Sequence, residues 1–161
     1  MPKRNLATTR LEGGCACGSI RYALKAKPLI VHACHCTDCQ RLTGGPFVIN
    51  AWIEKAKVEL LSSNPASFKF DTGGRDNSVH FCPQCGTYVW TEYMPGFCFV
   101  RACTLDEQNA LIPDVHIFAR SKQPWLDLPG DIPVHEVYYD RDKVWPDDSL
   151  ARFAAVTASM K

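Results

Sequence analysis

The feature that most constrains this chain is the motif CHCTDC at residues 34–39, which places the thiols of Cys34, Cys36 and Cys39 in one short segment. Thiolates are soft ligands, and three so close together indicate a metal such as zinc. A tetrahedral zinc needs four donors, so a fourth position is either closed by another protein group or open to water or substrate. Whether that fourth position is open or closed decides whether the site can be catalytic or only structural.

The composition is that of one globular domain. The 161 residues include nine cysteines, 46% hydrophobic and 22% charged residues, and the net charge is +1. A net charge this close to zero argues against a nucleic-acid partner. Residues 1–10 are basic without an apolar run behind them, which argues against a secretory signal, and no stretch approaches the roughly 20 apolar residues of a membrane span. We therefore expect no membrane partner and a cytoplasmic location, where the cysteines stay reduced.

Apolar and polar residues alternate along most of the chain, as on half-buried strands. The pattern predicts strands within residues 18–25, 47–53, 58–60, 68–70, 79–81, 88–90, 97–100 and 115–118, with turn residues between them, including 72–74. Helical segments are expected at 37–43, capped by Thr37, and at 149–160, capped by Asp147 or Asp148. Residues 124–133 are expected to form a loop. The prediction is a mainly β domain with a short C-terminal helix.

Two other cysteine pairs share a trailing glycine, in the motifs CACG at residues 15–18 and CPQCG at residues 82–86. Glycine allows a positive φ, which lets backbone amides point at thiolate sulfurs. Together, Cys15, Cys17, Cys82 and Cys85 supply four thiols for a closed, structural zinc that joins distant parts of the chain. The alternative is a redox-active disulfide between Cys82 and Cys85. The one-residue spacing of the first pair and the strand pattern that resumes at Tyr88 disfavour it.

The central motif lacks a trailing glycine, because Gln40 follows Cys39. Three interpretations stay open: a zinc with an open fourth position, a zinc whose fourth ligand is a histidine, or unmetallated thiols, which the close clustering disfavours. The candidate histidines are His32, His35, His80 and His116. An open position would favour a substrate thiol, held as a thiolate beside a carbonyl carbon, so that a C–S bond could form or break. Zinc-bound hydroxide is the competing nucleophile.

The three motifs, in this order, resemble the glutathione-dependent formaldehyde-activating enzyme family, which includes the centromere protein V type domains. The resemblance runs from about Gly13 to about Trp125. It implies an Mss4-like fold of several small coiled antiparallel sheets, and two Zn²⁺ per chain. The structural zinc would lie on Cys15, Cys17, Cys82 and Cys85, and the catalytic zinc on Cys34, Cys36 and Cys39. It also implies carbon–sulfur lyase activity on a small thiol or thiol–aldehyde adduct, with glutathione as one candidate.

On this basis the chain divides into an N-terminal extension (1–10), a zinc domain (11–145) and a C-terminal helix or tail (146–161). Strict members of the family continue after the third central cysteine with a Trp-Lys-Pro-like run, whereas this chain has QRLTGGPF at residues 40–47. It is therefore similar to the broad branch of the family.

Several residues outside the cysteine motifs are candidates for the site. His116, Lys122 and Trp125 belong to a segment that resembles one common in the family, and Lys122 with Arg120 could hold a substrate carboxylate. The simpler interpretation puts His116 on a strand and Trp125 in the core. His35 lies between two ligands and is a candidate acid or base.

Cys98 and Cys103 are five positions apart, so on one strand they would face opposite sides and could not share an ion. We interpret them as buried structural thiols. In the alternative, Cys103 beside Arg101 is the nucleophile of a methionine sulfoxide reductase B-like enzyme. The opposing class of function is a non-catalytic, zinc-stabilised binding module.

Overall fold

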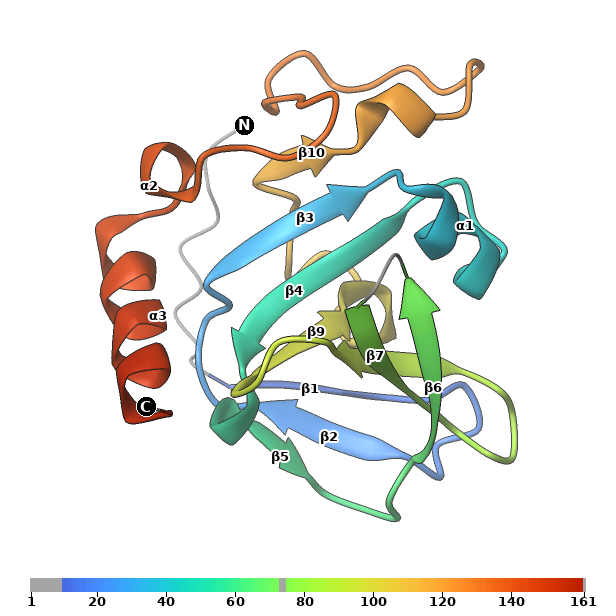
Figure 1. The fold of residues 1–161 in the computed structure, drawn as a ribbon. Helices are drawn as coiled ribbons and strands as arrows, with labels where there is room; N and C mark the ends of the chain where they lie inside the picture. The colour runs from blue at the N-terminus through green and yellow to red at the C-terminus, as the bar shows by residue number, and fades with distance from the viewer. Residues whose placement is uncertain (1–9, 73–74, 161) are drawn as a thin grey trace.

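The computed structural model describes residues 10–72 and 75–160, in which two β-sheets carry three α-helices (Figure 1). The predicted N-terminal extension lies outside these residues except for Arg10, as do residues 73 and 74 of the predicted turn. The small sheet has the order β1-β2-β5. Its strands are β1 (Leu11–Gly14), β2 (Arg21–Leu24) and β5 (Val58–Leu60).

The large sheet has the order β10-β3-β4-β9-β8-β7-β6. Its strands are β3 (Ile30–Cys34), β4 (Val48–Glu54), β6 (Ala66–Thr72), β7 (Arg75–Phe81), β8 (Tyr88–Glu92), β9 (Phe97–Arg101) and β10 (Val115–Ile117). Its neighbouring strands are antiparallel except β10 and β3, which run parallel. A parallel pair needs a long connection, and here β4 to β9 lie between the two strands in the sequence.

The helices are α1 (Thr37–Thr43), α2 (Arg141–Val144) and α3 (Asp147–Ser159), with single 3₁₀ turns at η1 (Lys55–Lys57), η2 (Ala102–Thr104) and η3 (Ala119–Ser121). Figure 1 shows α1 beyond the end of β3 and α3 near its start, so the two helices lie at opposite ends of that strand. None of the helices in residues 10–72 and 75–160 is long and apolar enough to cross a membrane.

Two apolar clusters form the core. The first includes Tyr22 and Leu24 of the small sheet and Val89 and Val100 of the large one, so it joins the two sheets. The second is built around Trp52, whose ring meets Phe97, Phe99, Trp145 and Phe153 with centroids 4.6–6.0 Å apart. The second cluster packs α3 against β4 and β9, and it also includes the three central cysteines.

The prediction of a mainly β fold with a short C-terminal helix is confirmed, with two sheets in place of several. The expected cap of α1 was wrong: Cys36 is the N-cap, and its Sγ accepts the N–H of Cys39 at 3.4 Å. The expected acidic cap of α3 was also wrong, because Asp147 and Asp148 lie in its first turn after Pro146. There they favour the helix through its dipole.

Candidate metal centres

The four cysteines of the glycine-trailed motifs come together between the two sheets. Cys15 and Cys17 follow β1, Cys82 and Cys85 follow β7, and their four Sγ atoms lie within 4.8 Å of one another. The Sγ of Cys17 is 3.5 Å from that of Cys15 and 3.7 Å from that of Cys82. Zn–S bonds of about 2.3 Å in a tetrahedron give S–S edges of about 3.8 Å, so these thiols fit a zinc ion.

The two turns that carry these thiols are built alike. Gly18 and Gly86 have φ angles of 80° and 74°, as the trailing glycines predicted. The Gly18 N–H donates to the Cys15 carbonyl at 3.0 Å, and the Gly86 N–H donates to the Cys82 carbonyl at 2.9 Å. The N–H of Ile20 points at the Sγ of Cys15, 3.2 Å away.

Hydrogen bonds in these turns favour the thiolate forms of Cys15 and Cys85. Burial raises the pKa of Cys15, but the Ile20 N–H and the Ser19 hydroxyl lower it by more, to about 7. The hydroxyl and N–H of Thr87 lower the pKa of Cys85 to about 5. Because metals bind the thiolate, both shifts favour metal binding near neutral pH.

The three central cysteines form a second, separate cluster where β3 ends and α1 begins. The Sγ atoms of Cys34, Cys36 and Cys39 lie within 4.8 Å of one another. Cys34 is buried, whereas Cys36 and Cys39 are partly exposed. Among the side chains that the structure describes, no fourth His, Cys, Asp or Glu donor belongs to this group. The arrangement could therefore hold a metal through three thiolates.

The three thiols influence one another strongly. The thiols of Cys34 and Cys39 donate to the Sγ of Cys36 and lower the pKa of Cys36 to about 2. The same contacts and burial raise the pKa of Cys34. The Cys34 thiol lowers the pKa of Cys39, but the Cys36 thiol and burial raise it to about 11, and the Arg101 charge opposes that rise. Of the three, only Cys36 therefore favours the thiolate form without a metal, and a cation between the sulfurs would favour the ionisation of all three.

The histidines considered as a fourth ligand have other partners. His35 Nε2 lies 2.9 Å from His116 Nδ1, and the two rings stack with centroids 5.2 Å apart. The two remaining candidates are His32 and His80. His32 forms a hydrogen bond with the Tyr139 hydroxyl at 2.6 Å, and His80 lies 3.3 Å from a carboxylate oxygen of Glu92.

His35 is fully buried between His116 and the ring of Phe47. Burial, followed by the charges of His116 and Lys122, lowers the pKa of His35 to about 4, so it is neutral at pH 7. A buried, neutral imidazole suits the positioning of the backbone between Cys34 and Cys36 better than proton exchange with a ligand.

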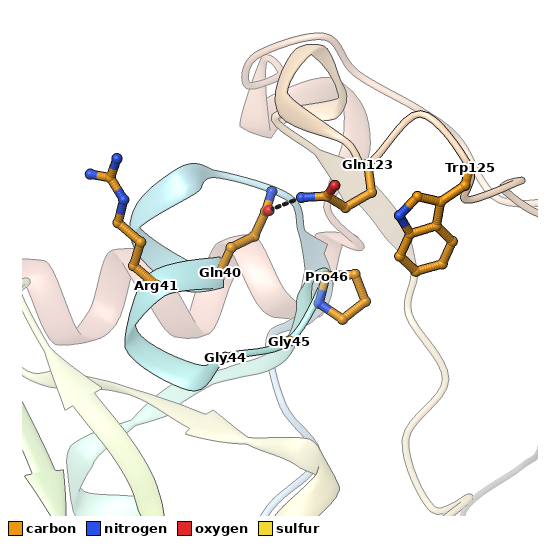
Figure 2. Close-up of a pocket in the computed structure, with 7 residues that line it drawn as sticks. All are labelled: Gln40, Arg41, Gly44, Gly45, Pro46, Gln123 and Trp125. Atoms are coloured by element: carbon orange, nitrogen blue, oxygen red, sulfur yellow. Dashed lines mark hydrogen bonds between the residues drawn. The ribbon is translucent and has the colours of Figure 1, made fainter.

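Lys122 and Trp125 lie on the segment that faces α1. The Lys122 ammonium donates to the carbonyls of Gln123 and Leu126 at 3.2 and 2.7 Å, so it holds a turn together. Placing Trp125 in the core was wrong, because 68% of it is exposed. Figure 2 shows its ring opposite Pro46, across a cleft of about 400 Å³. The lining residues are Gln40, Arg41, Gly44, Gly45, Pro46, Gln123 and Trp125.

Gln40, which the sequence did not single out, joins α1 to the segment after η3. Its Nε2 donates to the carbonyls of His35 and Ser121 at 2.7 and 2.9 Å. Its Oε1 accepts from Gln123 Nε2 at 2.6 Å (Figure 2). In the sequence, only its position directly after Cys39 could have indicated this role. The side chain fixes the cysteine helix against one wall of the cleft.

Cys98 and Cys103 belong to neither cluster. Cys98 is buried on β9 as expected, and burial raises its pKa to about 12. The expectation that Cys103 is buried was wrong, because Cys103 is exposed on the 3₁₀ turn η2, where the chain has left the strand. Arg101, proposed as its partner in the reductase interpretation, instead directs its guanidinium to Asn50 and Tyr88.

Two sheets, a C-terminal helix and two thiol clusters define a mainly β protein with two places that could hold metal ions. Residues 10–121 match the model of the family described as "Glutathione-dependent formaldehyde-activating enzyme", and the chain belongs to this family. No curated protein matches it. Among solved structures, a Rhodobacter sphaeroides protein studied by Northeast Structural Genomics has a TM-score of 0.48 and 19% identity, over 78% of this chain and 100% of the other.

Proposed function

We propose that this protein is a zinc-dependent carbon–sulfur lyase that forms or cleaves adducts between a small thiol and an aldehyde at Cys34, Cys36 and Cys39. One observation carries the proposal: three clustered thiols, two of them partly exposed, have no fourth protein donor in the described part of the chain. The family description names glutathione and formaldehyde, so S-hydroxymethylglutathione is the first substrate to test.

Zinc bound by the three thiolates would supply a fourth coordination position that holds a substrate sulfur as its thiolate. Cys34, Cys36 and Cys39 together carry three negative charges against two positive ones, which favours a soft ligand over water. In the synthetic direction the substrate sulfur forms a bond to the carbonyl carbon. The C=O π pair moves to oxygen, which takes up one proton while the thiol loses one. Lysis reverses each of these changes.

The cleft beside α1 is the proposed place for the non-reacting part of the thiol. Its lining includes Arg41, two residues after Cys39, and the exposed ring of Trp125. The indole face suits a peptide-like chain. The Arg41 guanidinium points away from Trp125 (Figure 2) and would have to turn toward the cleft to bind a carboxylate. His116 and Lys122, both expected near the substrate, would act indirectly, His116 by packing on His35 and Lys122 by holding the turn before Trp125.

The other cluster, Cys15, Cys17, Cys82 and Cys85, would hold a second, structural zinc, since four donors close the tetrahedron. Both sites need reduced thiols, which is consistent with a reducing compartment such as the cytoplasm.

Cobalt substitution tests the proposal. Co²⁺ in a thiolate site absorbs in the visible region, and its bands respond to a new ligand. In protein loaded with two cobalt ions, glutathione or 2-mercaptoethanol should change the spectrum saturably, and S-hydroxymethylglutathione should be turned over. Cys39→Ser should lose both effects, while Cys103→Ser, outside both clusters, should keep them. If no thiol changes the spectrum, the result would instead support a non-catalytic binding module, in which a protein group closes the fourth metal position.

A further inference from the structure

The large sheet buries one cation that the proposed chemistry has not used. Arg101 ends β9 and is only 5% exposed. Among the side chains that the structure describes, no carboxylate forms an ion pair with it, and its buried Nε has no hydrogen-bond partner. A buried guanidinium without a counter-charge is costly, so its position calls for an anion nearby.

The two groups that hold this guanidinium are neutral. Nη1 donates to the Oδ1 of Asn50, the cross-strand partner of Arg101 on β4. The guanidinium carbon lies 3.8 Å from the centroid of the Tyr88 ring, in a cation–π contact. Asn50 and Tyr88 fix the orientation of Arg101, but neither cancels its charge.

The sheet register places Arg101 on the same face of the large sheet as Cys34, two strands away. Cys34 on β3 pairs with Val48 on β4, and Asn50 pairs with Arg101. Val48 and Asn50 are two residues apart on one strand, so Cys34 and Arg101 project from the same face of the sheet. The guanidinium therefore lies on the side of the sheet that carries the cysteine cluster.

The charges of Arg101 and of the cysteine cluster are complementary. Three thiolates and one divalent cation leave one negative charge, and a substrate thiolate in the fourth position adds another. Both charges would lie in a partly desolvated place, where Coulomb interactions are several-fold stronger than in water. A fixed guanidinium beside the cluster therefore stabilises each of these anionic states.

We propose that Arg101 is a positioning residue of the three-cysteine site, whose buried charge stabilises the anionic metal–thiolate centre and the thiolate that enters it. Asn50 and Tyr88 support this role by holding the guanidinium in place. The inference rests on the proposed function, since it requires a metal at Cys34, Cys36 and Cys39.

The test measures metal affinity directly. Co²⁺ binding is followed by absorption, in competition with a chelator, for the wild type, Arg101→Met, Arg101→Lys and Asn50→Asp. Asn50→Asp is the sharpest variant, because it sets a carboxylate against Nη1 and cancels the charge without opening a cavity. Arg101→Met and Asn50→Asp should each weaken Co²⁺ binding at the three-cysteine site by at least about 10-fold. Arg101→Lys keeps the positive charge and should lose less of the Co²⁺ affinity.

Co²⁺ bound at the four-cysteine site is the internal control, and its affinity should be the same in all variants. If Arg101→Met does not fold, Asn50→Asp still decides, because its carboxylate gives the arginine a partner. Wild-type affinity in Asn50→Asp would overturn the inference, and so would equal losses in Arg101→Lys and Arg101→Met. A wild-type protein that binds no cobalt at the three-cysteine site would instead refute the proposed function.

Discussion

The sulfur of Cys17 lies 3.7 Å from that of Cys82, although 65 positions separate them in the chain. Cys17 follows β1 of the small sheet, and Cys82 follows β7 of the large sheet. The interior between the sheets is apolar, with Tyr22 edge-on to Trp90 at 5.9 Å between ring centroids. A metal at this cluster would crosslink the two sheets at the edge of their shared core.

Cys15→Ser should therefore destabilise the whole fold. Metal binding and folding are coupled at such sites, so the loss of one ligand should lower Tm by at least about 10 °C. Thermal unfolding by circular dichroism measures this effect, and a strong chelator should lower the Tm of the wild type similarly. The matched control is Cys103→Ser, an exposed thiol outside both clusters, whose Tm should stay within about 2 °C. Equal Tm values for the two variants would contradict a structural metal.

Cys39→Ser should separate activity from stability. Cys39 is partly exposed on α1, and its cluster belongs to one segment of the chain, so it crosslinks no distant elements. We expect a Tm close to that of the wild type, one metal ion fewer per chain by elemental analysis, and no adduct cleavage. A fall in Tm as large as that of Cys15→Ser would mean that both clusters are structural.

Gln40→Ala should loosen the cysteine helix from the cleft wall while the metal stays bound. The change removes three hydrogen bonds, to His35, Ser121 and Gln123, for a net cost of about 1–3 kcal/mol. The kcat/KM for adduct cleavage should fall with an unchanged metal content. Gln123→Ala removes only one of these bonds and should do less. A larger effect from Gln123→Ala would show that the cleft wall matters more than the helix.

The metal-ligand clusters could be predicted from the sequence because thiol spacing and trailing glycines are local signals. Gly18 and Gly86 have the positive φ angles that their motifs predicted. Strand β3 was missed because all its residues are buried, so no alternation marks it. Arg101 was missed as a neighbour of the cluster because the residues that hold its guanidinium, Asn50 and Tyr88, come from two other strands. Contacts set by sheet register leave no mark in the local sequence.

The ion pair between Arg152 and Glu54 should couple α3 to β4. Arg152 donates from Nε and Nη2 to the two Glu54 oxygens at 2.8 and 2.6 Å, and Glu54 is buried. Arg152→Met strands a buried carboxylate and should cost about 3 kcal/mol, whereas Glu54→Gln should cost less, because Arg152 still reaches solvent. Urea unfolding of both single variants and the double variant gives the coupling energy. A coupling energy near zero would show that this ion pair does not stabilise the fold.

The stability of the protein should fall in mild acid, partly through His32. Burial lowers the pKa of His32 from 6.5 to about 3. Tyr139 accepts from the indole N–H of Trp145 at 2.7 Å, and its hydroxyl forms a hydrogen bond with His32 Nε2 at 2.6 Å, so the imidazole is buried among neutral groups that favour its uncharged form. Below pH 6.5 the unfolded chain takes up a proton that the folded chain refuses, so folding stability falls as pH falls.

His32→Gln isolates this contribution, since an amide can still form a hydrogen bond with Tyr139 but does not titrate. Each pH unit below about 6.5 should remove about 1.4 kcal/mol from the wild type through His32 and nothing from the variant. The stability advantage of the wild type at pH 7.5 should therefore shrink by about 2 kcal/mol at pH 5. Acid release of metal affects both proteins and cancels in the difference. A constant difference in urea unfolding energies between pH 7.5 and 5 would mean that the folded protein protonates His32 as readily as the unfolded chain does.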